Sequence, residues 1–121
     1  MDCIFCKIIN NEIPSYTIYE DEYVKCFLDI SPKKNAHTLI VPKKHFTDIN
    51  DIPEDILLHV VSTAKKIMKL IEERMSADGF ELVQNNGTLE LVKHFHLHII
   101  PNYKGRTKKL DPKEVYEILT K

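Results

Sequence analysis

The chain has 121 residues, and its 17 basic and 18 acidic side chains leave a formal net charge of −1. This length suits a single domain over residues 1–121, and the balanced charge argues against a nucleic-acid-binding or membrane-binding surface. No apolar run approaches the roughly 20 residues that cross a bilayer, the N-terminus lacks a signal-peptide pattern, and three cysteines do not suggest a disulfide framework. We therefore expect a cytoplasmic protein that binds neither nucleic acid nor membrane.

Hydrophobic periodicity in the first half predicts a short helix and then three strands, over residues 3–10, 16–20, 23–29 and 38–42. Asn10, Asn11 and Pro14 suit the end of the helix. Phe27 and Asp29 lie on one face of the second strand, since alternate residues point the same way. Such a pair can hold a nucleobase and accept hydrogen bonds from ribose. The alternative is a core phenylalanine beside a surface aspartate.

The clearest element is an amphipathic helix over residues 53–75, where apolar residues recur every three or four positions. Pro53 and the acidic residues after it suit the helix start, and Asp78-Gly79 suits its end. Strands over 80–85 and 94–100, a loop over 101–109 and a last helix that begins at Asp111 follow. The fold class is therefore α+β, with a five-stranded antiparallel sheet, one long helix packed on it and short helices at both termini.

Segment 94–101, with the sequence HFHLHIIP, holds three of the chain's six histidines in alternation with large apolar residues. On a strand, the apolar residues would enter the core and the histidines would form a row on the other face. Such a row suits metal ligation, because neutral imidazole binds zinc well. It also suits nucleophilic catalysis at phosphorus, in which one imidazole attacks while its neighbours orient it and move protons. Alternation alone does not decide between them.

A second candidate site lies at the N-terminus, where Cys3-x-x-Cys6 has the spacing of zinc ligands and also of a redox pair. A redox pair would normally lie in a thioredoxin-like βαβ unit, which this segment lacks. Two unpaired buried cysteines are the simpler alternative, and His45 and His94 are candidates to complete a metal site. With only three glycines, the chain has no glycine-rich phosphate-binding loop.

The pattern of segment 94–100, histidine and apolar residues in alternation, resembles the signature of the histidine triad (HIT) nucleotide-binding family. Five further segments fall in order where that family places similar residues: 3–9, 12–14, 19–21, 27–32 and 37–45. The resemblance covers most of the chain and extends to the zinc-containing Cys-x-x-Cys type and to purine nucleoside phosphoramidases. It implies a HIT-like fold, a homodimer and a purine nucleotide or nucleotidyl substrate.

The resemblance also implies a set of functional residues. His96 would attack the α-phosphorus to form a covalent nucleotidyl-histidine intermediate, which water then cleaves. His98 would contact the phosphate and help to protonate the leaving group, and the carbonyl group of His94 would orient His96. The implied nucleotide-binding residues are Ile4, Phe5, Ile13, Phe27, Asp29, Ile30, His37, Asn85 and His98. A structural zinc would be held by Cys3, Cys6, His45 and His94, and no organic cofactor is implied.

The turn over residues 85–92 departs from the family pattern. It is shorter by about two residues, and Glu90 and Leu91 stand where a phosphate-binding glutamine and serine are usual. A carboxylate there would repel a phosphate unless it points away. One hypothesis is that Lys104 or Arg106 replaces the lost phosphate contacts. Two alternatives to a nucleotide hydrolase therefore remain: a nucleotide-binding or scaffold protein with little turnover, and a zinc enzyme that uses all three triad histidines as ligands.

Overall fold

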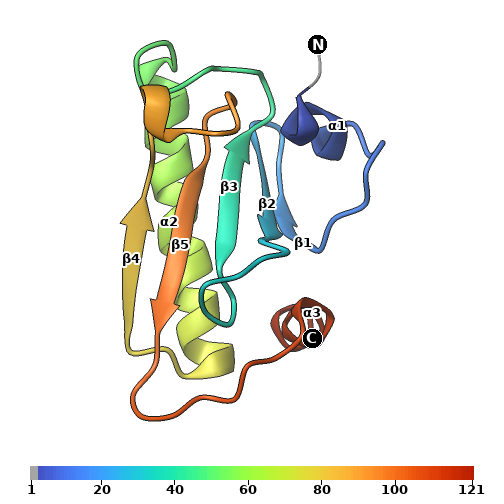
Figure 1. The fold of residues 1–121 in the computed structure, drawn as a ribbon, viewed down its shortest axis with the longest axis vertical. Helices are drawn as coiled ribbons and strands as arrows, with labels where there is room; N and C mark the ends of the chain where they lie inside the picture. Colours follow the sequence, from blue (N-terminus) through green and yellow to red (C-terminus); the bar gives the residue numbers. More distant parts are fainter. Residues whose placement is uncertain (1–2) are drawn as a thin grey trace.

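The computed structural model describes residues 3–121 and shows one antiparallel sheet with helices around it (Figure 1). The strands are β1 (Thr17–Glu20), β2 (Val24–Leu28), β3 (Thr38–Pro42), β4 (Gly79–Val83) and β5 (Leu97–Asn102), and the helices are α1 (Ile4–Ile9), α2 (Glu54–Met75) and α3 (Pro112–Leu119). The five strands are ordered β1-β2-β3-β5-β4, and every neighbouring pair is antiparallel. The predicted fold class is confirmed.

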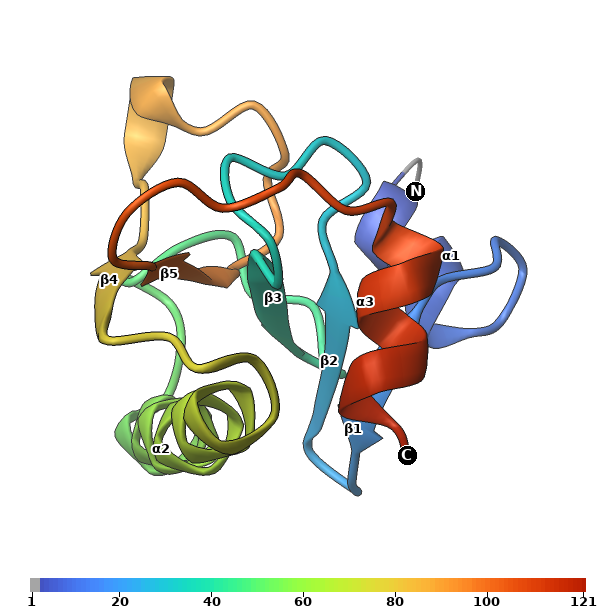
Figure 2. The ribbon, with the colours of Figure 1, turned by 90° about the horizontal axis from the view of Figure 1, so that it is seen from below.

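The two faces of the sheet are covered by different helices. Figure 2 shows α2 on one side of the central strands and α1 on the other. The apolar residues that α2 buries against the sheet are Val60, Ala64, Ile67 and Ile71. On the opposite face, α1 packs Phe5 and Ile8 against Phe27, Leu39 and Val41. Burial of these two apolar layers favours the fold, and a cavity lies on the α1 side of the sheet.

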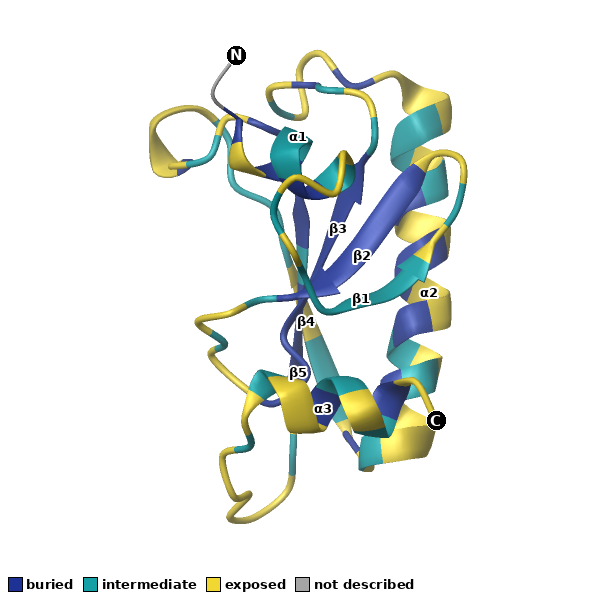
Figure 3. Ribbon diagram, turned by 90° about the vertical axis from the view of Figure 1, so that its right-hand side faces the viewer, coloured by how far each residue is buried: buried dark blue, intermediate teal, exposed yellow. Residues whose placement is uncertain are grey.

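Local signals explain where the helices begin and end. Helix α2 ends at Ser76, which adopts a left-handed conformation (φ 60°) and donates its amide hydrogen to Glu72. The predicted end of the helix at residue 75 is confirmed, and Gly79 already begins β4. Helix α3 begins with a capping box between Asp111 and Glu114, as predicted. Figure 3 shows the alternating buried and exposed stripes of α2, and no helix within residues 3–121 combines the length and apolar character that a bilayer crossing requires.

The predicted histidine strand is displaced, because β5 begins at Leu97 and not at His94. Two features stop the pairing of β3 with β5 before His94. The carbonyl oxygen of His94 accepts a hydrogen bond from the His96 ring and not from a strand. Strand β3 ends at Pro42, which has no amide hydrogen to donate. At the other end, β5 continues through Pro101. This residue pairs only with β4, because β3 begins opposite Ile99 and does not reach Pro101. The alternation of faces persists, and Phe95, Leu97 and Ile99 are buried in the core on the α2 side.

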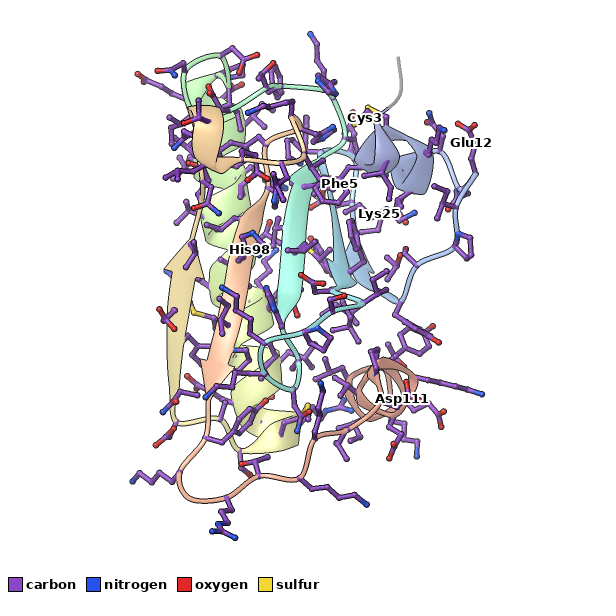
Figure 4. The ribbon with its side chains drawn as sticks, viewed as in Figure 1. Cys3, Phe5, Glu12, Lys25, His98 and Asp111 are labelled. Carbon is purple, nitrogen blue, oxygen red and sulfur yellow. The ribbon has the colours of Figure 1, made fainter. Side chains whose placement is uncertain are left out.

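Helix α1 is anchored to the sheet by a buried lysine of β2. The Lys25 side chain is 2% exposed, and its Nζ atom donates to the carbonyl oxygen of Ile8 over 2.9 Å and to Oδ1 of Asn11 over 3.0 Å. Asn11 has a left-handed backbone (φ 61°), which turns the chain back toward β1. This anchor positions the helix that carries Cys3 and Phe5 over the sheet (Figure 4).

Candidate active site and metal centre

A cavity of about 400 Å³ opens between α1, the sheet and the turn that precedes β5. We call it the main cavity; its lining includes Ile4, Phe5, Ile8, Ile13, Phe27, Asp29, Ile30, Leu39, Asn85, Glu90, His96 and His98. Its apolar end lies beneath α1, and its polar end contains the histidines. This volume lies within the range of small-ligand sites. Of the residues predicted to bind a nucleotide, all except His37 line the cavity.

Aromatic rings shape the middle of the main cavity. Phe5 of α1 contacts Phe27 of β2 edge to face, with ring centroids 5.7 Å apart. Phe5 also contacts His96, with centroids 4.8 Å apart and planes 82° apart. The position of the His96 ring therefore depends on α1 as well as on its own segment.

His96 presents one ring nitrogen to the main cavity. The side chain is 4% exposed, and its Nδ1 atom lies 2.8 Å from the carbonyl oxygen of His94. Because a carbonyl oxygen can only accept, Nδ1 must carry the hydrogen. Neutral His96 then has its lone pair on Nε2, which is the arrangement that a nucleophilic imidazole requires.

A chain of three hydrogen-bonded groups fixes the tautomer of His98. The amide of Lys33 donates to Nδ1 of His37 over 3.1 Å, so His37 carries its hydrogen on Nε2. That nitrogen lies 3.0 Å from Nδ1 of His98 and donates to it, which leaves the hydrogen of neutral His98 on Nε2. Burial lowers the pKa of His98 to about 4 and also lowers the pKa of His37, so both rings are neutral near pH 7.

Asp29 lies beside this chain. Its Oδ1 atom accepts a hydrogen bond from the amide of Ser31, and its Oδ2 atom lies 3.6 Å from Nε2 of His37. These three side chains form a potential metal-ligand group, Asp29, His37 and His98. The short contact between the two imidazoles already uses the lone pair of His98 Nδ1, so this group acts as a hydrogen-bonded relay. His37 is thus placed behind His98 and not in the wall of the main cavity.

Two cysteines and two histidines converge next to this site; we call Cys3, Cys6, His45 and His94 the cysteine–histidine cluster. Cys3 caps α1, and its Sγ atom accepts the amide hydrogen of Cys6, so the Cys-x-x-Cys spacing directs both thiols to one end of the helix. His45 comes from the segment after β3, and His94 from the segment before β5. Their ligand atoms lie within 4.8 Å of one another.

The geometry of the cysteine–histidine cluster fits a tetrahedral metal ion. The sulfur–nitrogen distances are 3.3–3.5 Å, and the two Nδ1 atoms are 3.1 Å apart. A tetrahedral zinc ion would separate such ligands by roughly 3.3–3.8 Å. Nε2 of His94 donates to the carbonyl oxygen of Pro42 over 2.8 Å, so its Nδ1 lone pair faces the thiols. Burial lowers the pKa of His94 to about 4, which keeps this ring in the neutral form that binds metals.

The same tautomers argue against a zinc ion held by all three triad histidines. His94 directs its free nitrogen toward the cysteines, whereas His96 uses Nδ1 for a carbonyl group and His98 uses Nδ1 for His37. Neither His96 nor His98 belongs to the cysteine–histidine cluster.

The turn before β5 places a carboxylate in front of His96. The Glu90 side chain is 8% exposed, its Oε1 atom accepts the amide hydrogen of Val92, and its Oε2 atom lies 3.3 Å from Nε2 of His96. Oε2 forms no hydrogen bond with any residue among 3–121. The carboxylate therefore points toward His96, and its orientation does not relieve the repulsion of a phosphate that the sequence led us to expect.

The basic residues that were candidates to replace lost phosphate contacts lie elsewhere. Lys104 and Arg106 are exposed on the loop between β5 and α3, and neither lines the main cavity. Neither is therefore placed to contact a phosphate group in the main cavity in this structure. Sequence reasoning also missed the Lys33 amide and the Pro42 carbonyl group, which fix two tautomers; backbone groups leave no signature in the choice of side chain.

Comparisons with known proteins agree with this geometry. The HIT domain family matches residues 10–105. An uncharacterized HIT-like protein of Methanocaldococcus jannaschii is 47% identical over 105 residues, which are 85% of this chain and 81% of that protein. An adenosine 5′-monophosphoramidase of Saccharomyces cerevisiae is 43% identical over 82% of this chain and 61% of its own length. A zinc-bound histidine triad family protein of Mycobacterium smegmatis superposes with a TM-score of 0.92 and 32% identity, over 99% of this chain and 91% of that one.

Proposed function

Because this chain belongs to the HIT domain family, we propose that it is a hydrolase or nucleotidyl transferase that acts at the α-phosphorus of nucleoside phosphoramidates or related nucleotidyl compounds. The observation that carries the proposal is the 2.8 Å bond from His96 Nδ1 to the His94 carbonyl oxygen, which leaves the Nε2 lone pair free in a buried cavity. A free imidazole lone pair is the chemical requirement for attack on phosphorus.

The proposed reaction has two steps. His96 Nε2 attacks the α-phosphorus, a nitrogen–phosphorus bond forms, and the bond to the leaving group breaks as His98 donates its Nε2 hydrogen to that group. Water then attacks the phosphorus of the nucleotidyl-histidine and gives a proton back to Nε2 of His98, the bond to His96 breaks with its electron pair returning to Nε2, and the nucleoside monophosphate leaves. A nucleotide acceptor in place of water would give transfer. The Lys33–His37–His98 chain supports this role, since it holds the donor hydrogen of His98 on the required nitrogen.

The proposed substrate is a purine nucleotide derivative. The apolar end of the main cavity, with Phe5 and Phe27 in contact, suits a flat base. Asp29 would accept hydrogen bonds from the ribose hydroxyls, and Asn85, which also lines the cavity, would lie near the phosphoryl group. The yeast relative named for adenosine 5′-monophosphoramidase activity supports a purine phosphoramidate as the first compound to test.

We further propose that the cysteine–histidine cluster holds a structural zinc ion. Four protein ligands would close its coordination, so zinc would supply crosslinking and not catalysis. It would connect α1, the segment after β3 and the segment before β5. We also propose a cytoplasmic homodimer whose subunits each consist of one domain.

Rapid-quench trapping tests the proposed function. The protein is mixed with an adenosine 5′-phosphoramidate labelled at phosphorus, quenched under basic conditions and assayed for protein-bound label. Wild type should accumulate a histidine-linked nucleotide, and His96→Ala should not. His59→Ala is the matched control, because His59 lies on α2 and contacts Asp21 on the far side of the sheet. Label that is equal in wild type and His96→Ala would contradict the assignment of the nucleophile.

One observation favours a second candidate, a nucleotide-binding or scaffold protein with little turnover. Glu90 Oε2 lies 3.3 Å from the proposed nucleophilic nitrogen, where it obstructs the approach of a phosphoryl group. A protein that binds nucleotide tightly but neither forms the intermediate nor turns over guanosine or adenosine phosphoramidates, dinucleoside polyphosphates or nucleotidyl sugars would fit this candidate.

A further inference from the structure

Glu90 occupies the position that a substrate phosphoryl group must take. Its Oε2 atom is 3.3 Å from Nε2 of His96, and reacting atoms approach to about 3–3.5 Å before bond formation. A carboxylate and a phosphoryl group therefore compete for one position, and any reaction at His96 requires the Glu90 side chain to move.

Hydrogen bonds satisfy only one of the two oxygens of this carboxylate. One oxygen, Oε1, accepts the amide hydrogen of Val92, whereas Oε2 is buried, faces Nε2 of His96 and forms no hydrogen bond with the described residues. A buried, unpaired carboxylate oxygen costs free energy, and water would satisfy it if the side chain turned outward. The flanking Leu89 and Leu91 are 77% and 94% exposed, so the turn itself is not packed into the core.

The charged residues that line the main cavity also disfavour a highly charged ligand. The charged residues in its lining are the two carboxylates, Asp29 and Glu90; the lining contains no lysine or arginine. Sites that bind polyphosphates normally supply cationic side chains or metal ions to the phosphates. This lining is therefore unsuited to a ligand that carries several negative charges near His96.

We propose that Glu90 is a specificity-determining residue that selects nucleotidyl compounds with a single negative charge on the α-phosphoryl group and an uncharged or cationic leaving group. The inference depends on the proposed function, since it assumes that the nucleotide binds with its phosphorus at His96. A nucleoside phosphoramidate with an amine leaving group has this charge, whereas dinucleoside polyphosphates carry more. The nucleoside monophosphate product carries nearly two negative charges at neutral pH, so Glu90 also disfavours the product.

A series of ligands that differ in charge tests the proposal by titration calorimetry at pH 8. The probes are adenosine, which is uncharged, adenosine 5′-monophosphate methyl ester, which carries one negative charge, and adenosine 5′-monophosphate, which carries two. The proteins are wild type, Glu90→Gln and Glu90→Ala, together with Glu73→Gln as the matched control. Glu73 lies on the exposed face of α2, on the other side of the sheet, so this control makes the same charge change outside the cavity.

Both Glu90 variants should bind the monophosphate at least about tenfold more tightly than wild type, because a close like-charge contact is removed. The gain for the methyl ester should be smaller, and adenosine should bind all four proteins with the same affinity. Equal adenosine affinity without a gain for the monophosphate would overturn the role of Glu90 and leave the proposed function intact. Failure of adenosine to bind any of the proteins would overturn the proposed function, and the inference with it.

Discussion

The carbonyl oxygen of His94 accepts a hydrogen bond from Nδ1 of His96 over 2.8 Å, while the ring of His94 faces the thiols of Cys3 and Cys6. One residue therefore connects the proposed metal centre, through its side chain, to the proposed nucleophile, through its backbone. Any change that moves the His94 backbone will also turn the His96 ring. This connection makes the two proposed sites interdependent, and the mutational tests below exploit it.

Loss of the two cysteine ligands should remove the metal and impair the reaction at a distance. Cys3→Ser/Cys6→Ser should bind less than one-tenth of the wild-type zinc, unfold at a lower temperature and lose on the order of 10²-fold in kcat, because small misplacements of reacting groups cost about that much. Metal analysis, thermal unfolding and phosphoramidate turnover measure the three effects.

The third cysteine provides the control for this experiment. Cys26 is buried in β2 and lies outside the cysteine–histidine cluster, so Cys26→Ala should retain its zinc. Full zinc content in the double variant would instead indicate that the triad histidines hold the metal, and the assignment of His94 to a structural site would then be wrong.

Substitution of the buried lysine should loosen α1 and weaken nucleoside binding. In Lys25→Met the carbonyl oxygen of Ile8 loses its donor, which should lower the free energy of unfolding by about 1–3 kcal/mol. Because α1 carries Phe5, the Kd for adenosine should rise several-fold in calorimetry. Lys43→Met is the control, since Lys43 forms a partly exposed ion pair with Glu20 whose contribution is about 0–1 kcal/mol. Unchanged adenosine affinity in Lys25→Met would show that α1 does not depend on this anchor.

Asp21 should make stability depend on pH in acid. Burial raises the pKa of this carboxyl, but hydrogen bonds from His59, from the amides of Tyr23 and Val24 and from Tyr19 outweigh burial and lower the pKa to about 2. Because the folded value lies below the ordinary value of 3.8, the stabilisation is complete above about pH 4 and is lost as the pH falls toward 2.

Asp21→Asn mimics the protonated group and provides the measurement. Its unfolding free energy should fall below that of wild type by about 1–3 kcal/mol at pH 6, and the difference should shrink between pH 4 and pH 2 in denaturant titrations. Asp78→Asn, at an exposed position before β4, should show no such dependence. A difference that stays constant across this pH range would contradict the role assigned to the Asp21 carboxylate.

The sequence predicted well the elements whose residues carry a strong local signal. The apolar periodicity of α2, the capping pair Asp111 and Glu114, and the apolar run of β3 each specify one structure, and the observed boundaries agree within a residue or two. The resemblance to the histidine triad family, drawn from segment 94–100 and the segments before it, is confirmed by the family match.

Features that depend on backbone contacts could not be predicted in this way. The strand predicted from His94 begins only at Leu97, because a side chain takes the carbonyl group that a neighbouring strand would otherwise bind. Lys25 shares a face of β2 with Phe27, because alternate residues of a strand point the same way. Its burial depends on the carbonyl group of Ile8 in α1, and the sequence pattern of β2 does not indicate that contact. The inward orientation of Glu90 likewise follows from the path of an irregular turn.

The most direct test of the account is a crystal structure of the zinc-loaded protein with a non-hydrolysable adenosine phosphoramidate analogue. We predict that Nε2 of His96 lies within about 3.5 Å of the phosphorus and in line with the leaving group, that His96 Nδ1 still donates to His94, and that the Glu90 carboxylate has left its position. A His96 ring that is turned away from the phosphorus, or whose Nε2 atom is bound to a cation, would contradict the proposed reaction.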